Sequence, residues 1–373
     1  MKNWFSSGCT ILDLAVANKL PGGFPSGRIT HIFGDPSTTK SVFALEPLGA
    51  AQRKGGKAFL VDTEYSLDYN WAELNGLTID HIPEEEKEPK NGVFGLRHPE
   101  TIEELFDSVI TKANNEIAER ELEHICAIGI DSLTSLPSVV ELSDKLEKPT
   151  FGGDRAKQFG KAYRKVLRRI YKNGLAVIAI DQTRQRMDGG GITYSGGRAI
   201  RFYADVQIFL KVLEKITNKR GKTIGVVIGF EIKKNKVAPP FQIGKFRFLF
   251  KYGIDDIGSN LLWLRENKPL SDEQIEKIEK KVKEKFKARL KQAKKSGRST
   301  KAIEKSQRQE IDKTIKSKLN RTWFEFKGVK KRSLDDMIKH IEENNYEKRL
   351  RKAISRTWKE INKAEDRKMK VRF

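Results

Sequence analysis

The chain has 373 residues, of which 38% are hydrophobic and 33% charged, and its formal net charge is +23. The length favours two or three domains, and the charge points to a polyanionic partner, most often nucleic acid; a lysine-rich surface without such a partner is the alternative. The longest apolar runs, such as 174–180, are too short to cross a membrane, and the N-terminus has no secretory signal. Integral membrane proteins are therefore excluded. Two cysteines cannot form a disulfide framework, which excludes disulfide-rich secreted proteins, so the cytoplasm is the expected compartment.

Short apolar runs alternate with helical stretches over the first two thirds of the chain. Strands are expected at 28–34, 57–64, 125–132 and 175–182, and a helix follows the first of them. Continuous apolar strands separated by helices are typical of a parallel sheet that is covered on both faces. We therefore predict an α/β fold with a mostly parallel, twisted sheet flanked by helices.

A sequence close to the phosphate-loop motif G-x-x-x-x-G-K-[ST] lies between the first strand and its helix. In that motif the loop amides and the helix N-terminus wrap a phosphate, Lys40 neutralises the terminal phosphates, and the Ser41 hydroxyl binds Mg²⁺. Thr39 replaces the second glycine and is expected to weaken or reshape the site, while an unrelated strand–turn–helix is the alternative. The expected nucleotide-binding residues of this segment are Gly34, Asp35, Pro36, Ser37, Thr38, Thr39, Lys40, Ser41 and Val42.

Acidic and amide side chains end three of the expected strands. Asp131 is placed to bind Mg²⁺ together with Ser41, and Glu64 is placed to orient an attacking water. Gln182, at the end of the fourth strand, is expected to face the same phosphate region. Open α/β sheets bind their ligands at the carboxyl ends of the strands, although acids at strand ends also serve merely to cap helices.

Positive charge is concentrated after Glu266. Residues 267–373 contain 35 Lys and Arg against 17 Asp and Glu, a net of +18, whereas the remainder holds 38 against 33, a net of +5. Apolar residues at helical spacing predict a helical hairpin over 271–319, either with a solvated face or as a basic arm that contacts phosphates. The expected domains are a core at 1–266, a basic helical insert at 267–320 and a small helical C-terminal domain at 321–373.

Several motifs together resemble the RecA family of recombinases. They include GDPSTTKS, VDTEYSLD, IGIDSLTSLP, IDQTR, GGRAIRFYADV and KKNKVAPPF, in the order in which the family has them. The resemblance covers about 5–254 and extends weakly to 323–360. A phosphate loop that lacks its second glycine is similar to that of phage recombinases of the UvsX type, so a phage or otherwise divergent member is expected. The resemblance implies a RecA-like P-loop ATPase core with a basic helical C-terminal region.

The resemblance also implies roles in the binding and hydrolysis of ATP with Mg²⁺. Lys40 and Ser41 correspond to residues that hold the β- and γ-phosphates and the metal, and Asp68 and Trp71 to residues that contact and stack on adenine. Lys234 and Lys236 correspond to paired lysines that reach the ATP of the neighbouring subunit; a basic surface turn is the alternative. The residues implied in catalysis are Lys40, Glu64, Asp131, Gln182, Lys234 and Lys236.

Two glycine-rich loops, about 144–157 and 186–198, correspond to the DNA-binding loops of the family. Basic side chains in and near them are expected to contact phosphates, and apolar ones to wedge between bases or stack on them. Ordinary solvent loops are the alternative. The expected DNA-binding residues are Phe151, Arg155, Lys157, Arg164, Arg186, Met187, Ile192, Tyr194 and Arg198.

The function implied by the resemblance is that of an ATP-dependent recombinase. Such a protein forms a filament on single-stranded DNA in a bacterial or phage-infected cell and pairs that strand with homologous duplex DNA. Single-strand-binding or mediator proteins are expected partners, and a membrane is not. We expect the family's N-terminal segment to be absent and assembly to use a different contact. The alternatives are a DNA-binding mediator or regulator with weak ATPase activity and a hexameric helicase-type motor; a non-enzymatic chromatin-like binder would leave the strand-end acids without a purpose.

Overall fold

A computed structural model describes residues 3–79, 94–119, 126–143, 153–185, 192–194, 197–268, 272–296, 299–319 and 323–363. It divides into two compact units, Met1–Asp256 and Ile257–Phe373. The boundary expected after Glu266 falls inside helix α9 (Asp256–Asn267), and the division expected at 320 stays a prediction. In these described stretches, every helix is too short or too polar to cross a membrane.

The first unit is built on one large sheet. Strands β9, β3, β7, β6, β4 and β5 run parallel to one another, and β8, β10, β11 and β12 pair antiparallel. The mostly parallel sheet predicted from the sequence is therefore confirmed. Along the sheet the order is β12 (Gly253–Asp255), β11 (Ile243–Leu249), β10 (Thr223–Asn235), β9 (Val206–Thr217), β3 (Ile29–Gly34), β7 (Ala176–Gln185), β6 (Cys126–Asp131), β4 (Lys57–Asp62) and β5 (Phe94–Arg97), with β8 (Ile192–Tyr194) on β7.

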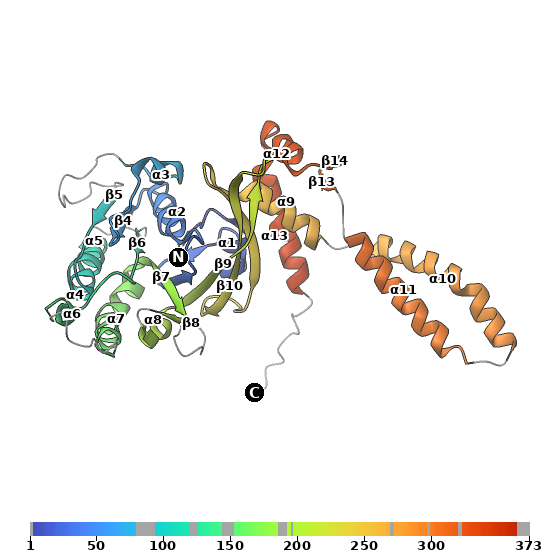
Figure 1. Ribbon diagram of the computed structural model, residues 1–373, viewed down its shortest axis with the longest axis horizontal. Coiled ribbons are helices and arrows are strands. Elements are labelled where there is room, and N and C mark those ends of the chain that lie inside the picture. The colour runs from blue at the N-terminus through green and yellow to red at the C-terminus, as the bar shows by residue number, and fades with distance from the viewer. Residues whose placement is uncertain are drawn as a thin grey trace. The chain divides into compact units, whose positions relative to one another are not determined.

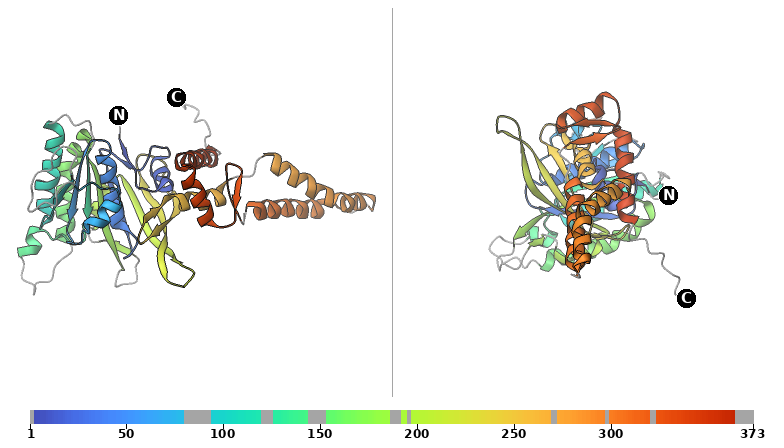
Figure 2. Two further views of the ribbon diagram at one scale, coloured as in Figure 1. Left: turned by 90° about the horizontal axis from the view of Figure 1, so that it is seen from above. Right: turned by 90° about the vertical axis from the view of Figure 1, so that its right-hand side faces the viewer.

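Helices cover both faces of the parallel strands (Figures 1 and 2). On one face, a buried apolar cluster joins β4, β6 and β7 to the helices α4 (Ile102–Glu104), η1 (Leu105–Ile110), α5 (Thr111–Glu119) and α7 (Gly153–Asn173). On the other face lies α2 (Lys40–Gln52), so close that a Cβ on Gly129 would approach the carbonyl oxygen of Ala44 to 2.6 Å. Because neither face meets water, these strands read as continuous apolar runs.

Shorter elements complete the first unit. Helix α8 (Gly197–Tyr203) leads into β9, and α3 (Tyr69–Leu74) and α6 (Val139–Ser143) follow the ends of β4 and β6. The N-terminal stretch forms the small sheet of β1 (Trp4–Phe5) and β2 (Phe24–Pro25) around α1 (Thr10–Ala17). The carboxyl ends of β3, β4, β6 and β7 meet along one edge, since these strands are parallel neighbours.

The second unit combines a long helical hairpin with a small α+β subdomain. The hairpin consists of α10 (Asp272–Lys295) and α11 (Lys301–Leu319), as the sequence predicts (Figure 1). The subdomain contains β13 (Phe324–Phe326), β14 (Val329–Lys331), α12 (Leu334–Glu343) and α13 (Glu347–Lys363). Trp263 of α9 stacks on Trp358 of α13, with ring centroids 6.0 Å apart.

Candidate nucleotide-binding and catalytic site

The expected phosphate loop leads from the end of β3 to the start of α2. Lys40, the first residue of α2, is buried, and its Nζ donates hydrogen bonds to the carbonyl oxygens of Gly34 at 3.0 Å and Asp35 at 2.7 Å. Burial lowers the pKa of Lys40, while the nearby charges of Asp131, Asp35 and other acids oppose that shift. The lysine is thus held at the centre of the loop, among the groups that a phosphate would contact.

The residue that replaces the motif's second glycine adopts a left-handed conformation. Thr39 has φ 62°, and Ser37 in the same loop has φ 61°. A β-branched residue is strained in this region, which glycine occupies freely. The Thr39 hydroxyl is also buried, and within the described part of the chain it has no hydrogen-bond partner. The loop therefore keeps the backbone geometry that its usual glycine favours, at a cost in strain.

Three strand ends bring Glu64, Ser132 and Gln182 together. The Ser132 Oγ donates a hydrogen bond of 2.7 Å to Glu64 Oε1, and Gln182 Nε2 donates to the same oxygen at 3.2 Å. These contacts join residues that are 68 and 118 positions apart. The predicted convergence of Glu64 and Gln182 is therefore present. The role of Ser132 was missed, because its hydroxyl is noticeable in the sequence only as the residue after Asp131.

Asp131 lies beside the start of α2 in a strongly acidic setting. Burial, followed by the charges of Glu64 and Asp62, raises the pKa of Asp131 to about 6, although a hydrogen bond to Ser41 and the charge of Lys40 oppose this. Within the described residues, no group of three or more His, Cys, Asp or Glu side chains is arranged so that it could hold a metal ion by itself. Mg²⁺ usually binds through one or two carboxylates together with substrate phosphates. The Asp131 carboxylate and the Ser41 hydroxyl fit that pattern.

Hydroxyl groups tie the end of β7 to the phosphate loop and to the β6 end. Thr183 donates to Asp35 Oδ1 at 2.8 Å, and the Gln182 backbone N–H donates to Thr134 Oγ1 at 3.0 Å. Thr134 itself donates to the buried Asp181. Both threonines lie within quoted motifs, IGIDSLTSLP and IDQTR, but the sequence assigns no role to either one, since their contacts depend on which strands are neighbours.

The residues expected near adenine lie at the start of α3. The Asp68 carboxylate caps the helix by accepting the backbone N–H of Trp71 at 3.1 Å. The Trp71 ring is half-buried and packs edge-on against Phe248 of β11, with centroids 5.9 Å apart. The capping contact gives Asp68 a structural role in addition to the predicted one, and the ring position of Trp71 is fixed by the sheet.

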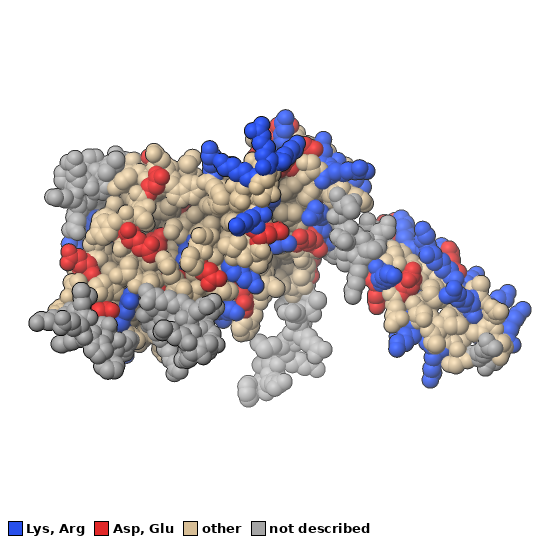
Figure 3. Space-filling model, in the orientation of Figure 1, with Lys and Arg blue, Asp and Glu red and all other residues tan. Residues whose placement is uncertain are grey.

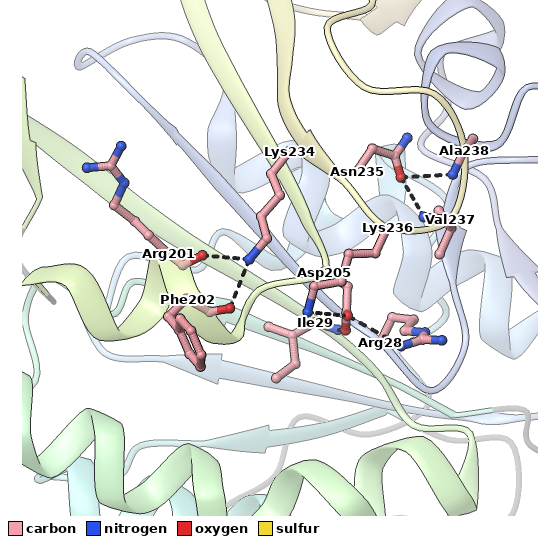
Figure 4. Close-up of polar contacts among 10 residues, drawn as sticks. All are labelled: Arg28, Ile29, Arg201, Phe202, Asp205, Lys234, Asn235, Lys236, Val237 and Ala238. Carbon is pink, nitrogen blue, oxygen red and sulfur yellow. Dashed lines mark hydrogen bonds and ion pairs between the residues drawn. The ribbon is translucent and has the colours of Figure 1, made fainter.

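Lys234 lies near the carboxyl end of β10, and Lys236 follows the end of that strand (Figure 4). Lys234 Nζ donates to the carbonyl oxygens of Arg201 at 2.9 Å and Phe202 at 2.8 Å, and Lys236 pairs with Asp205 at 3.3 Å. Burial lowers the pKa of Lys234, and the charge of Lys236 adds to that shift. Both lysines line a cavity of about 580 Å³ together with Arg28, Arg164, Arg168, Tyr171, Phe202 and Asp205.

The residues expected to bind DNA differ in their exposure and in the elements to which they belong. Lys157 and Arg164 are exposed on α7, whereas the Arg155 guanidinium donates to the carbonyl oxygens of Leu133 and Thr134 at 2.7 and 2.6 Å. In this structure Arg155 therefore fastens α7 to the segment after β6. Ile192 and Tyr194 belong to β8, which pairs with β7, and Arg198 belongs to α8. Phe151, Arg186 and Met187 lie outside the described residues.

Comparison with known proteins identifies the family. The family model described as the RecA N-terminal domain matches residues 2–255, which include the whole of the site described above. The chain belongs to the RecA family of recombinases. Members of this family are DNA-dependent ATPases that act in DNA recombination and repair, and their nucleotide is ATP.

Several proteins named RecA are similar to this chain. That of Rippkaea orientalis is 33% identical over 262 residues, which cover 69% of this chain and 67% of the relative. That of a Synechocystis species is 32% identical, covering 69% and 66%, and that of Mesomycoplasma hyopneumoniae is 30% identical, covering 67% and 68%. The match to each relative thus spans about two thirds of its length. A crystal structure of the RadB recombinase is similar with a TM-score of 0.44 and 20% identity, over 67% of this chain and 98% of that one.

Proposed function

We propose that this RecA-family protein uses ATP to form a filament on single-stranded DNA, pairs that strand with homologous duplex DNA and exchanges the strands. The observation that carries the proposal is the contact of Gln182 with Glu64. This hydrogen bond connects Glu64, whose carboxylate is suited to orient a water molecule, with β7, the strand that leads toward the second expected DNA loop. Occupancy of the nucleotide site is thereby linked to the DNA-binding side of the subunit.

The nucleotide is held by the phosphate loop in this proposal. Lys40 exchanges its contacts with the loop carbonyl oxygens for contacts with the terminal phosphates, and the loop amides bind the phosphate oxygens. Ser41 and Asp131 would hold Mg²⁺, which when bound neutralises charge on the phosphates. Glu64 accepts hydrogen bonds from Ser132 and Gln182 through Oε1, so its orientation is fixed while its exposed carboxylate positions the attacking water.

Assembly completes the site in trans. Lys234 and Lys236 line the basic cavity at the end of β10 and supply positive charge to the ATP of a neighbouring subunit, as an arginine finger does. Phe202 is 72% exposed next to them, which fits an aromatic side chain that a partner subunit covers. A filament therefore hydrolyses ATP faster than a lone subunit.

The DNA is held mainly through phosphates. The basic residues expected in the two loops and on α7 bind the backbone, and the apolar ones separate bases. Single-strand-binding or mediator proteins control access to the same strand, and the cytoplasm of a bacterial or phage-infected cell is the compartment.

The direct test is ATP hydrolysis with and without single-stranded DNA. We expect stimulation by the DNA in the natural chain and loss of both basal and stimulated rates in Lys40→Ala. Lys54→Ala, which removes a lysine from the segment that follows the same helix, is the control and should keep both rates. Equal rates with and without DNA in the natural chain would contradict the proposal.

A second candidate is a mediator that binds nucleotide and DNA but turns over slowly. The left-handed Thr39 in the phosphate loop favours it, because a side chain at the position of the motif glycine keeps the backbone from approaching a phosphate as closely. Strand-exchange assays separate the two functions. Binding of DNA and nucleotide without exchange supports the mediator.

A further inference from the structure

Helix α10 carries a row of lysines on one side, which we call the lysine stripe: Lys280, Lys283, Lys287, Lys291 and Lys294. Their spacings of three and four residues place them within one sector of the helix, because successive residues turn by about 100°. With a rise of 1.5 Å per residue, the stripe is about 21 Å long. Together with Leu290, with Gln307 of α11 and with the acidic side chains of Glu276, Glu279 and Glu284, it lines a groove of about 880 Å³. The five lysines outnumber the three glutamates, all of which lie toward the N-terminal part of the helix.

The charge of the stripe increases along α10. Residues 272–284 contain four basic and five acidic side chains, whereas 285–295 contain six basic and no acidic ones. Lys283 pairs with Glu279 at 2.8 Å. For Lys287, Lys291 and Lys294, no acidic partner is found among the described residues. Figure 3 shows lysine and arginine predominating on the face of the hairpin in view.

The stripe does not contribute to the packing of the hairpin. Ile278, Val282 and Phe286 supply the buried or half-buried seam against α11, while the stripe lysines are exposed. Lysines four positions apart, such as Lys287 and Lys291, repel one another and destabilise an isolated helix. An anionic partner along the stripe removes this repulsion. The lysines are therefore better suited to binding an anion than to stabilising the helix.

The chemistry of the hairpin favours duplex DNA over a single strand. Proteins that bind single strands without sequence preference stack bases on aromatic side chains. Residues 272–319 contain one aromatic residue, Phe286, which is half-buried with the Arg289 guanidinium over its ring at 5.7 Å. A duplex carries one charge per about 1.7 Å of axis, so a 21 Å length of it carries about twelve phosphates, and a straight stripe can contact those on the side that faces it.

We propose that the lysine stripe of α10 binds the phosphate backbone of duplex DNA without reading its bases. The stripe lies outside residues 2–255, the part that the RecA family model matches. The site is independent of ATP, so it holds duplex DNA whether or not the nucleotide site turns over. Its role in the proposed recombinase is to keep a duplex near the filament while homology is tested.

The test uses the full chain without nucleotide and a short fluorescent duplex, with binding followed by anisotropy at several salt concentrations. The stripe variant is Lys287→Gln/Lys291→Gln/Lys294→Gln. The matched control is Lys277→Gln/Lys281→Gln/Lys285→Gln, which removes three exposed lysines from another side of the same helix. Circular dichroism establishes that both variants keep the helix content of the natural chain.

We expect the stripe variant to bind the duplex at least tenfold more weakly. The slope of log K against log salt should fall by about 2 to 3, since each phosphate contact contributes about 0.9. The control should change this slope by less than about 0.9, the contribution of one phosphate contact. The ATPase rate measured with single-stranded DNA should stay the same in both, so a chain without ATPase activity would still report on the stripe.

Three results would overturn the proposal. Equal losses in the two variants would mean that only overall charge matters. An equal loss on a single-stranded oligonucleotide would remove the preference for a duplex. Unchanged duplex affinity combined with reduced self-association in sedimentation would show that the stripe binds a second copy of the chain.

Discussion

Ser132 donates a 2.7 Å hydrogen bond to Glu64 across the ends of two neighbouring strands. Ser132 is fully buried whereas Glu64 is exposed, so the buried hydroxyl orients the exposed carboxylate. In Ser132→Ala we expect kcat for ATP hydrolysis to fall roughly five- to tenfold with little change in KM, because a hydrogen bond of this kind contributes about 1 kcal/mol. Steady-state kinetics measure this. Ser143→Ala, in the same segment after β6 but with its exposed hydroxyl bonded to the Val140 carbonyl oxygen, should keep the natural kcat, and a similar fall there would refute the role of Ser132.

Gln182 shares the same carboxylate oxygen and ends the strand that leads toward the second expected DNA loop. Gln182→Ala is expected to keep nucleotide binding and the basal ATPase rate but to lose most of the stimulation by single-stranded DNA. The ratio of stimulated to basal rates is the measurement. A variant with a normal ratio would show that the signal passes through another contact.

Replacement of Thr39 by glycine should relieve strain in the phosphate loop. The left-handed conformation costs a non-glycine residue about 1–2 kcal/mol, and the buried hydroxyl adds to this, while glycine costs about 1 kcal/mol in chain entropy. We expect a net gain of about 1 kcal/mol in the free energy of unfolding and tighter ATP binding. Urea unfolding and equilibrium titration with ATP measure the two effects.

Ser37→Gly provides the comparison for Thr39→Gly, since Ser37 has nearly the same φ. It should stabilise the fold in a similar way without tightening ATP binding, because only position 39 corresponds to the motif glycine. If both variants tighten binding equally, loop flexibility rather than close backbone approach controls the affinity.

The location of Lys234 in the basic cavity predicts complementation between subunits. Lys40→Ala lacks its own nucleotide site but retains Lys234, and Lys234→Ala has the opposite defect. If the lysine acts on a neighbouring subunit, a mixture of the two inactive variants should recover part of the DNA-stimulated ATPase rate. A mixture that stays as inactive as each variant alone would place the function of Lys234 within its own subunit.

Asp13 makes the stability of the first unit depend on pH. Burial raises the pKa of Asp13 from 3.8 to about 6, although hydrogen bonds from Ser6 and Ser7 oppose the shift. A raised pKa means that folding favours the protonated carboxyl. The contribution of protonated Asp13 to the free energy of unfolding is therefore complete below about pH 4 and is lost as the pH rises to about 6. A difference of about two units corresponds to about 3 kcal/mol.

The Asp13→Asn variant tests this pH dependence. It should lack the fall in unfolding free energy between about pH 4 and 6 that the natural side chain causes. Denaturant unfolding at several pH values measures the difference. Parallel pH profiles for the two proteins would show that Asp13 titrates normally in the folded state.

Local patterns were sufficient to predict much of the fold. Apolar runs between turn residues located β3, β4, β6 and β7, the central parallel strands, because a strand buried on both faces must be apolar throughout its length. Three- and four-residue spacing located the α10–α11 hairpin for the same kind of reason. The phosphate loop was recognisable since its chemistry depends on consecutive residues.

The contacts within the site could not be predicted in this way. Glu64, Ser132 and Gln182 meet because β6 lies between β4 and β7, and nothing in any one segment specifies that order. The bonds of Lys234 to the end of α8 depend on the same long-range arrangement. The predicted proximity of Glu64 and Gln182 is observed as a hydrogen bond, while the roles assigned to the site residues stay predictions. The contacts of Ser132 and Arg155 became visible only in the structure.

Residue order along the chain was thus enough to establish the α/β class, the phosphate loop and the basic C-terminal region, since each depends on neighbours within a few turns of backbone. Strand pairing decided that Ser132 and Gln182 both donate to Oε1 of Glu64, how Lys234 is held, and which residues line the basic cavity. Those features join residues as far apart as Arg28 and Lys236, 208 positions along the chain, and their energies depend on burial and distances that exist only after the sheet has formed.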